Sequence, residues 1–286
     1  MDAKPERACV VTGAGRGLGR ALAVHIAAAG HPVALCSRTT AELADAVEEV
    51  ERAGGRATAH TVDVGDAGAV DTFALEVAER HGSVWAVVNN AAVLGPVGRI
   101  DTVQVDRWLE AIAVDIGGVA AVTRAFVSQM RSSGGGRIVN LSGGGVGGPA
   151  LQRRVSAYTA SKAAVGVLTE LLAGELVTDD ITVNTVAPGP QPTTFLEEVL
   201  RVGPEIAGPE LYAGTLRDRE SPACLDAFFE LIDFLLADES DWLTGKLLSA
   251  RWDRVDDLQA RRDQLVGTSL LTLRRIDGEL FTEVPR

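Results

Sequence analysis

The chain has 286 residues, of which 46% are hydrophobic and 23% are charged, so it is long enough to bury a substantial core. Asp and Glu total 39 against 27 Lys and Arg, and the net charge of -12 disfavours nucleic acids and anionic membranes as partners. The 31 glycines follow no Gly-X-Y repeat, which excludes a collagen-like chain and indicates that they occupy specific turns.

The cysteines and histidines predict neither disulfides nor a metal site. The three cysteines are an odd number without close spacing, which indicates a reducing compartment. The four histidines have no partner at metal-ligand spacing. The amino-terminal residues lack the apolar segment of a secretion signal, and no uncharged apolar run is long enough to cross a bilayer. We therefore expect a cytoplasmic protein without a metal and without membrane contact.

Short β-rich runs alternate with longer helical patterns along most of the chain. The expected strands are nearly continuous in apolar residues, as strands buried on both faces are. They cover 8–12, 32–37, 57–62, 83–89, 137–142 and 181–187, with helices at 17–29, 40–53, 66–80, 106–131 and 157–177. A weaker helix near 222–237 and a last strand at 246–250 follow. This alternation predicts a doubly wound α/β fold with a mostly parallel sheet and right-handed crossovers.

Two stretches fall outside this alternation. Residues 190–221 carry four prolines, and we expect an irregular substrate loop that is long enough to act as an active-site lid. Residues 254–286 form a charged carboxy-terminal extension, which could pack on a partner subunit. The Asp-Gly pair at 277–278 predicts a hairpin turn within the extension.

A glycine-rich turn follows the first expected strand and opens the first helix. It reads TGAGRGLG over residues 12–19. Such a turn lets the backbone approach a pyrophosphate, whose charge is stabilised by free N–H groups and by the helix dipole. We therefore expect a dinucleotide cofactor at this turn. The residues that we expect to contact it there are Gly13, Arg16, Gly17, Leu18 and Gly19.

The end of the second expected strand carries Ser37 and Arg38, about 20 residues beyond the turn. An NAD site would place an acidic residue there, on the ribose 2′-hydroxyl. A guanidinium at this point, helped by Arg16 within the turn, suits a 2′-phosphate through charge-assisted bidentate contacts. We therefore favour NADP(H) over NAD(H). The alternative is that Arg38 is only a solvated residue at a strand end.

The order and spacing of five motifs resemble those of the short-chain dehydrogenase/reductase family. The motifs are TGAGRGLG at 12–19, Asp63-Val64, Asn89-Asn90-Ala91-Ala92, Tyr158-Thr159-Ala160-Ser161-Lys162, and Pro188-Gly189 followed by Thr193. The resemblance spans residues 8 to about 250 and implies one Rossmann-type catalytic domain of residues 1–253. It also implies a homodimer or homotetramer.

The resemblance assigns cofactor contacts beyond the glycine turn. It places Asp63 and Val64 at the adenine, and the segment from Pro188 to Thr193 at the nicotinamide amide. It also implies that Lys162 hydrogen-bonds the nicotinamide ribose. Together with Ser37 and Arg38 at the strand end, the full set of expected cofactor contacts outside the turn is Ser37, Arg38, Asp63, Val64, Asn89, Ala91, Tyr158, Lys162, Pro188, Gly189 and Thr193.

The pair Tyr158 and Lys162 carries chemistry that can be read from the residues themselves. They are four apart on an expected helix and so project from one face, which places an ammonium beside a phenol. A nearby positive charge favours the phenolate and lowers a tyrosine pKa from its usual value of about 10. Tyr158 could then exchange a proton with a substrate oxygen while a hydride moves to or from the adjoining carbon. An isolated pair of this kind would be an ordinary surface contact.

The segment after the fifth expected strand departs from the family pattern. The family has a serine that holds the substrate oxygen, and here Ser142 stands one residue early with Gly143 at the expected place. Backbone N–H groups from Gly143 to Gly145 could hold an oxyanion instead, or Ser142 or Ser156 could reach in. We retain Ser142 as a catalytic candidate.

Asp115 is the second departure, because the family has an asparagine that holds a water linked to the lysine. An aspartate can still accept hydrogen bonds. As an anion near Lys162 it would partly cancel the effect of the cation on Tyr158. Reduced or altered catalysis is therefore an alternative.

These features favour an NADP(H)-dependent oxidoreductase that interconverts a carbonyl and an alcohol on a small organic or secondary-metabolite substrate. The motivating features are the cofactor turn and the Tyr158/Lys162 pair. One alternative is a non-redox isomerase or cyclase, which Asp115 and Gly143 suggest. Another is a non-catalytic NADP-binding protein, against which the retained Tyr158/Lys162 pair argues.

Overall fold

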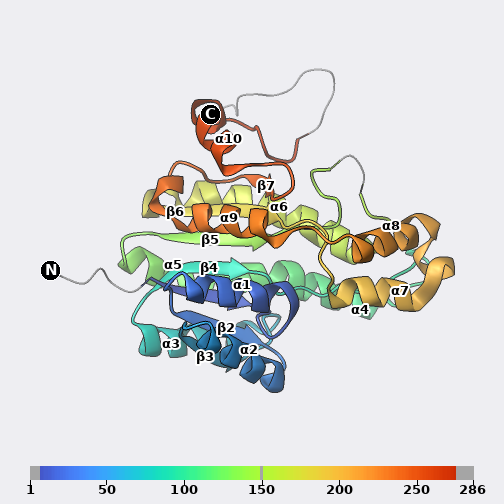
Figure 1. The fold of residues 1–286 in the computed structure, drawn as a ribbon, viewed down its shortest axis with the longest axis horizontal. Coiled ribbons are helices and arrows are strands. Elements are labelled where there is room, and N and C mark those ends of the chain that lie inside the picture. Colours follow the sequence, from blue (N-terminus) through green and yellow to red (C-terminus); the bar gives the residue numbers. More distant parts are fainter. Residues whose placement is uncertain (1–6, 149–150, 275–286) are drawn as a thin grey trace. The chain divides into compact units, whose positions relative to one another are not determined.

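The computed structural model describes residues 7–148 and 151–274 (Figure 1). Their strands form a seven-stranded sheet in the order β3-β2-β1-β4-β5-β6-β7. The doubly wound α/β fold expected from the sequence is therefore confirmed. The chain divides into two compact units. The first comprises Met1–Val93, Ile112–Ile138 and Asp179–Ile181, and the second comprises Leu94–Ala111, Val139–Thr178 and Thr182–Arg286.

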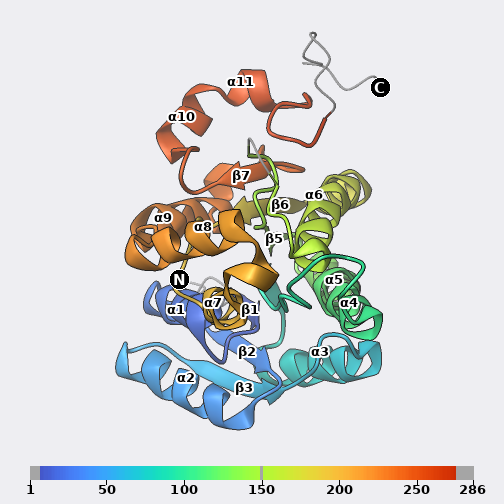
Figure 2. The same ribbon diagram turned by 90° about the vertical axis from the view of Figure 1, so that its right-hand side faces the viewer.

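The first unit contains the strands that precede residue 90 and their helices. Its elements are β1 (Ala8–Thr12), α1 (Gly17–Ala28), β2 (Val33–Ser37), α2 (Thr40–Arg52), β3 (Ala57–Thr61), α3 (Ala67–His81) and β4 (Val84–Asn89). Strand β1 pairs in parallel with β2 and β4, and every residue of β1 is buried, as the apolar run ACVVT predicts. Figure 2 shows α1 and α2 on one face of these strands, with α3 and α5 (Gly118–Ser132) on the other.

The strand order places a topological switch within the first unit. The chain runs from β1 outward through β2 to β3, and then returns to lay β4 on the other side of β1. The loops that follow β1 and β4 therefore leave the same edge of the sheet in opposite directions. In open α/β sheets, ligands bind in the crevice outside the strand ends at such a point.

The helix expected over 106–131 is interrupted. It consists of α4 (Val105–Ile112), a π-helical turn (Ala113–Gly117) and α5. The whole stretch Val105–Ser132 is long and apolar enough to cross a membrane by length and composition, and 44% of its most apolar window is buried in this structure. The core helix of a soluble protein passes the same test.

The second unit contains the later strands and helices. Its elements include the end of β5 (Gly136–Leu141), α6 (Ser156–Leu176), most of β6 (Ile181–Ala187), α9 (Leu225–Leu236) and β7 (Leu247–Ser249). Buried hydrogen bonds tie the strands to α6, because Thr169 Oγ1 lies 2.8 Å from Asn140 Nδ2 and 2.6 Å from Thr185 Oγ1. These bonds satisfy side chains that would otherwise be costly to bury.

Residues 190–221 are mostly helical, so the expectation of an irregular loop is wrong. They form α7 (Thr194–Ala207) and α8 (Pro209–Glu220), which pack against each other (Figure 2). Gly203, at φ +77°, kinks α7 directly before Pro204, and Pro209 occupies the first turn of α8. Proline is tolerated at a helix start because the N–H that it lacks would have no intrahelical acceptor there. Pro204 and Pro209 therefore mark the starts of helical segments, whereas Pro190 and Pro192 precede α7.

The extension after residue 253 packs within the second unit over its described part. It forms α10 (Val255–Ala260) and α11 (Arg262–Leu265), each of which buries a leucine. Lys246 Nζ donates hydrogen bonds to the carbonyls of Thr268 and Leu270 at 2.6 and 3.1 Å. Burial lowers the pKa of this lysine. The expected hairpin at 277–278 lies outside the described residues, and the domain boundary at 253 stays a prediction.

The three cysteines differ in solvent exposure, so their reactivity towards thiol reagents tests how the core is packed. Cys9 and Cys36 are buried in β1 and β2, whereas Cys224 is exposed, and all three are free. Burial raises the pKa of each buried thiol to about 12, because a low-dielectric interior disfavours the thiolate. The thiolate is the reactive form, so the buried pair should be inert.

We therefore expect a maleimide reagent to label only Cys224 in the native protein, up to about pH 9, and to label all three cysteines after unfolding. Mass spectrometry of proteolytic fragments identifies the labelled positions. The Cys224→Ser variant should take no label before unfolding. Native labelling of Cys9 or Cys36 would contradict the arrangement of β1 and β2.

Candidate functional site

The glycine turn joins β1 to α1 at the switch point of the first unit. Gly13 and Gly17 adopt φ +64° and +56°, a conformation that favours glycine. Helix α1 begins at Gly17 without a side-chain cap on its N-terminus and without an acidic residue in its first turn. Its first N–H groups and the helix dipole therefore suit an anionic ligand such as a pyrophosphate.

The turn is fastened to the end of β4 by Thr12 and Asn90. Asn90 Nδ2 donates to the carbonyl oxygens of Thr12 and Gly13 at 2.8 and 3.1 Å. Thr12 Oγ1 accepts hydrogen bonds from the backbone N–H groups of Asn90 and Ala91, both at 3.0 Å. We call these four contacts the turn latch. They bring the loops after β1 and β4 together where the ligand crevice is expected.

The turn latch leaves no room for side chains on two of the glycines. A Cβ on Gly13 would lie 2.8 Å from Ala91 Cα, and a Cβ on Gly19 would lie 2.4 Å from both Gly13 O and Asn90 Nδ2. The cradle that a dinucleotide pyrophosphate requires is therefore built from close backbone contacts, and the residues present fit such a group. Asn90 belongs to the Asn89-Asn90-Ala91-Ala92 motif, but its role in fastening the turn was not predicted from the sequence.

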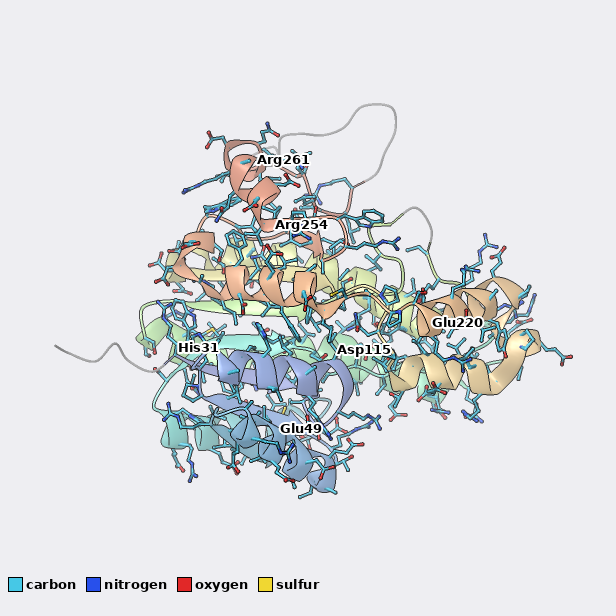
Figure 3. All side chains as sticks on the ribbon, in the orientation of Figure 1. His31, Glu49, Asp115, Glu220, Arg254 and Arg261 are labelled. Carbon is cyan, nitrogen blue, oxygen red and sulfur yellow. The ribbon has the colours of Figure 1, made fainter. Side chains whose placement is uncertain are left out.

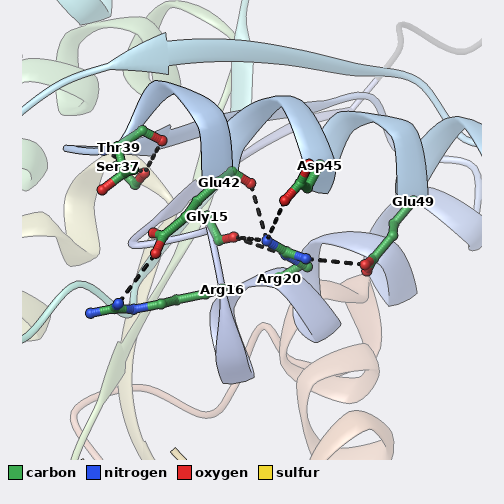
Figure 4. A network of polar contacts seen from close by, with 8 residues as sticks. All are labelled: Gly15, Arg16, Arg20, Ser37, Thr39, Glu42, Asp45 and Glu49. Carbon is green, nitrogen blue, oxygen red and sulfur yellow. Dashed lines mark hydrogen bonds and ion pairs between the residues drawn. The ribbon is translucent and has the colours of Figure 1, made fainter. Parts of the chain in front are cut away.

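The end of β2 and the start of α2 lie beside the turn (Figure 4). A Cβ on Gly15 would approach Ser37 Oγ to 2.8 Å, so Ser37 borders the turn closely. Arg16 Nη1 lies 3.2 Å from Glu42 Oε1, and Arg38 Nη1 lies 3.9 Å from Asp63 Oδ2. Each of the two arginines that we expect at a 2′-phosphate therefore has a carboxylate nearby. Glu42 was not predicted from the sequence as part of this site.

Asp63 and Val64 follow β3 in the same unit. Asp63 Oδ1 accepts a hydrogen bond from Gly65 N at 2.9 Å, while its side chain stays 46% exposed. Val64 is buried, and a Cβ on Gly118 would come within 2.7 Å of its Cγ2. Val64 therefore packs against the first turn of α5. The carboxylate of the neighbouring Asp63 remains accessible to solvent.

Asp115 is fully buried in the π-helical turn (Figure 3). Its Oδ1 accepts a hydrogen bond from Val93 N at 2.8 Å. The carboxylate therefore fixes the segment that follows Asn89 and Ala91 at the end of β4. Asn89 itself is buried in the last position of that strand. Within this unit, Asp115 acts as a positioning residue for the loop after β4.

Tyr158 and Lys162 lie on α6 in the second unit. Lys162 is buried, with Nζ 5.7 Å from the centre of the Tyr158 ring. Its Nζ donates a hydrogen bond to the carbonyl of Leu141, the last residue of β5, at 2.9 Å. The ammonium is therefore held beside the phenol by a backbone group. The juxtaposition expected from their spacing is present.

The Tyr158 hydroxyl lies against Gly143. A Cβ built on Gly143 would be 2.4 Å from the hydroxyl oxygen, so no side chain fits there without moving the tyrosine. Ser142 is buried, and among the described residues its Oγ has no hydrogen-bond partner. Ser156 Oγ accepts a hydrogen bond from Trp108 Nε1 at 3.0 Å. Gly143 stands where the family has a serine, and the space left by its missing side chain is occupied by the Tyr158 hydroxyl.

The Tyr158 ring packs edge-on against Phe195 of α7, at 5.1 Å between ring centres and 90° between planes. Around them lies an apolar cluster. Its members are Leu94, Val97, Val155, Tyr158, Phe195, Val199, Val202, Ala207, Leu211 and Tyr212. A cavity of about 320 Å³ adjoins this cluster and is lined by residues 95–97, 102–104 and 107 and by Glu198, Arg201 and Val202 of α7.

The segment before α7 carries the remaining expected contacts. Gly189 adopts φ +80°, and a Cβ on it would lie 2.9 Å from Ala223 Cβ. Thr193 occupies the N-cap position of α7 with an extended backbone. Its side chain makes no capping hydrogen bond with the described residues. Pro188 directly follows β6. Helix α7 therefore connects this segment to the cluster around Tyr158.

Comparisons with known proteins agree with this arrangement. The family profile described as short chain dehydrogenase matches residues 7–201. An uncharacterized oxidoreductase of Mycobacterium tuberculosis is 36% identical over 246 residues, covering 85% of this chain and 90% of that protein. The chloroplastic NADPH-dependent aldehyde reductase 2 of Arabidopsis thaliana is 30% identical over 260 residues, covering 85% and 92%.

Among solved structures, an NAD⁺-bound xylitol dehydrogenase is similar with a TM-score of 0.75 at 28% identity, covering 86% of this chain and 98% of that one. The chain also matches the probable oxidoreductase EphD of M. tuberculosis at 36% identity over 180 residues, or 63% of this chain. It spans only 30% of the length of that protein.

We expect Gly143→Ala to lower the free energy of unfolding by about 1–3 kcal/mol, because the added methyl group collides with the Tyr158 hydroxyl. Gly174→Ala is the matched control. It lies on the same helix as Tyr158, and no atom of the described residues comes within 4 Å of an added Cβ. This control should gain about 0.5–1 kcal/mol from helix propensity. Equal stabilities of the two variants in urea denaturation would show that Tyr158 does not lie against Gly143.

Proposed function

The chain belongs to the short-chain dehydrogenase family, and on that premise we propose that it is an NADP(H)-dependent oxidoreductase interconverting a carbonyl and an alcohol. Its substrate would be a small organic or secondary-metabolite molecule. The observation that carries the proposal is the Tyr158 hydroxyl, which lies at the end of β5 with the buried Lys162 ammonium beside its ring. Membership of the family supports an enzyme that uses a nicotinamide cofactor.

Residues of the first unit would hold the cofactor. The glycine turn and the N-terminus of α1 suit the pyrophosphate. Asp63 and Val64 suit the adenine, and Asn89 and Ala91 lie next to the turn latch. The choice of NADP(H) is supported by Arg16 and Arg38 and by the NADPH-dependent relative. The NAD⁺-bound neighbour shows that related proteins also use the other form.

Residues of the second unit would perform the proton transfer. When bound, the cofactor supplies hydride to the carbonyl carbon or accepts it from the alcohol. In reduction Tyr158 gives its hydroxyl proton to the substrate oxygen, so that its O–H bond breaks as the alcohol O–H bond forms. The Lys162 ammonium stabilises the phenolate that remains. Ser142 is our candidate to bind the substrate oxygen, and its buried hydroxyl has no hydrogen-bond partner among the described residues.

The assembly and location of the protein also belong to this proposal. We expect a homodimer or homotetramer, supported by the exposed apolar side chains Val167 and Leu171 on α6 and Leu109 on α4. We expect the cytoplasm, supported by the free cysteines, which suit a reducing compartment.

A non-redox isomerase or cyclase on the same scaffold is the second candidate. The observations that favour it are Gly143 in place of the family serine and the buried carboxylate of Asp115. It would convert substrate without any net change in NADPH absorbance. A non-catalytic cofactor-binding protein would bind the nucleotide tightly and turn over no substrate. Both outcomes differ from that of the reductase proposed above.

The chain has two tyrosines, which allows a matched test of the proton donor. We expect Tyr158→Phe to lower kcat by about 10²–10⁴-fold in a carbonyl panel monitored through NADPH absorbance. Nucleotide binding should survive, because the turn latch is untouched. Tyr212→Phe removes the other phenol hydroxyl and should retain most of the activity. Undiminished turnover by Tyr158→Phe would remove Tyr158 as the acid.

A further inference from the structure

An ion pair holds Arg16, one of the two arginines expected to meet a 2′-phosphate. Arg16 Nη1 lies 3.2 Å from Glu42 Oε1, and the two side chains are 60% and 30% exposed (Figure 4). Glu42 lies in the first turn of α2. The pair therefore joins the glycine turn to the helix that follows β2.

The neighbouring Arg20 is fully engaged and cannot replace Arg16. Its Nε donates to Gly15 O at 2.8 Å, and its Nη2 donates to Glu42 O at 3.2 Å. Its Nη1 lies 3.1 Å from Glu49 Oε1. Arg20 thus fastens α2 to the turn through backbone groups, which fixes where the Glu42 side chain starts.

The Glu42 carboxylate lies close to the end of β2, beside Gly15 of the glycine turn. A Cβ on Gly15 would be 3.2 Å from Glu42 Oε2 and 2.8 Å from Ser37 Oγ. Ser37 ends β2, the strand whose end faces the adenosine ribose in this fold. The carboxylate therefore borders the same small space as Ser37 and Arg16.

We propose that Glu42 is a specificity-determining residue that lowers the preference for NADPH over NADH by competing with the 2′-phosphate for Arg16. The inference rests on the proposed function. A 2′-phosphate carries a charge of about -1.5 to -2, so it must separate Arg16 from Glu42 and then sit beside the carboxylate. NADH has only a hydroxyl at that position and meets neither cost. Arg38 keeps its own carboxylate neighbour, Asp63, at 3.9 Å.

Calorimetric titration at fixed low ionic strength tests the proposal, because salt screens exposed charges. The probes are NADPH and NADH, each titrated into the full chain. We expect Glu42→Gln to lower the Kd for NADPH about fivefold while the Kd for NADH changes by less than about twofold. The modest size follows from the exposure of the pair.

Glu48→Gln is the matched control. It removes the same charge from the same helix and breaks an exposed ion pair with Arg52, at 2.7 Å. Both nucleotides should bind it as they bind the wild type. A second control places Glu42→Gln in an Arg16→Ala background, where its effect on NADPH should shrink, because only the repulsion between the carboxylate and the 2′-phosphate is left. Thermal unfolding of every variant checks that each one is folded.

The outcomes separate this inference from the proposed function. If the wild type binds neither nucleotide, the proposed function fails and the inference fails with it. If both nucleotides bind and Glu42→Gln leaves the ratio of their Kd values unchanged, only the inference is overturned. The same holds if the effect is undiminished without Arg16, if Glu48→Gln reproduces it, or if Glu42→Gln weakens NADH binding instead.

Discussion

The turn latch between Thr12 and Asn90 is the constraint on which the proposed cofactor site depends. A parallel sheet leaves the loops after β1 and β4 at one edge, but it does not hold them in contact. Two hydrogen bonds from the Asn90 amide to Thr12 O and Gly13 O close that gap. The closeness of the two loops in turn explains why Gly13 and Gly19 have no space for a Cβ. Backbone N–H groups are thereby presented to a ligand at the start of α1.

In the second unit, close packing also fixes the position of Tyr158, which we propose as the proton donor. Tyr158 lies against Gly143 because Gly143 lacks a side chain, and Lys162 is held beside its ring by the carbonyl of Leu141. The two departures from the family pattern therefore have local structural accounts. Gly143 makes room for the tyrosine hydroxyl, and Asp115 binds the backbone of Val93.

The sequence was sufficient to predict the fold because its central strands are apolar on both faces. The strands β1 and β6 have the expected bounds, and the remaining ones differ by one or two residues at their ends. The region 190–221 was mispredicted because a proline can start a helix as well as break one, and only the fold decides which. Pro209, at the first turn of α8, is the clear case.

The candidate site was predictable only where a motif is local in sequence. The glycine turn and the Tyr158/Lys162 pair depend on spacings of a few residues. The contacts of Arg16 with Glu42 and of Asn90 with Thr12 join residues 26 and 78 positions apart. Such pairs depend on tertiary packing, which the local pattern does not specify. The carboxylates beside Arg16 and Arg38 could therefore not be predicted from the sequence.

Calorimetric titration of NADPH into the wild type and into Asn90→Ala tests the role of the turn latch most directly. Our account predicts a measurable Kd for the wild type and a Kd about tenfold higher for the variant, the equivalent of losing two modest hydrogen bonds. Thermal unfolding confirms that the variant is folded at the temperature of the titration. Absence of binding by the wild type, or equal affinities of the two proteins, would contradict the account.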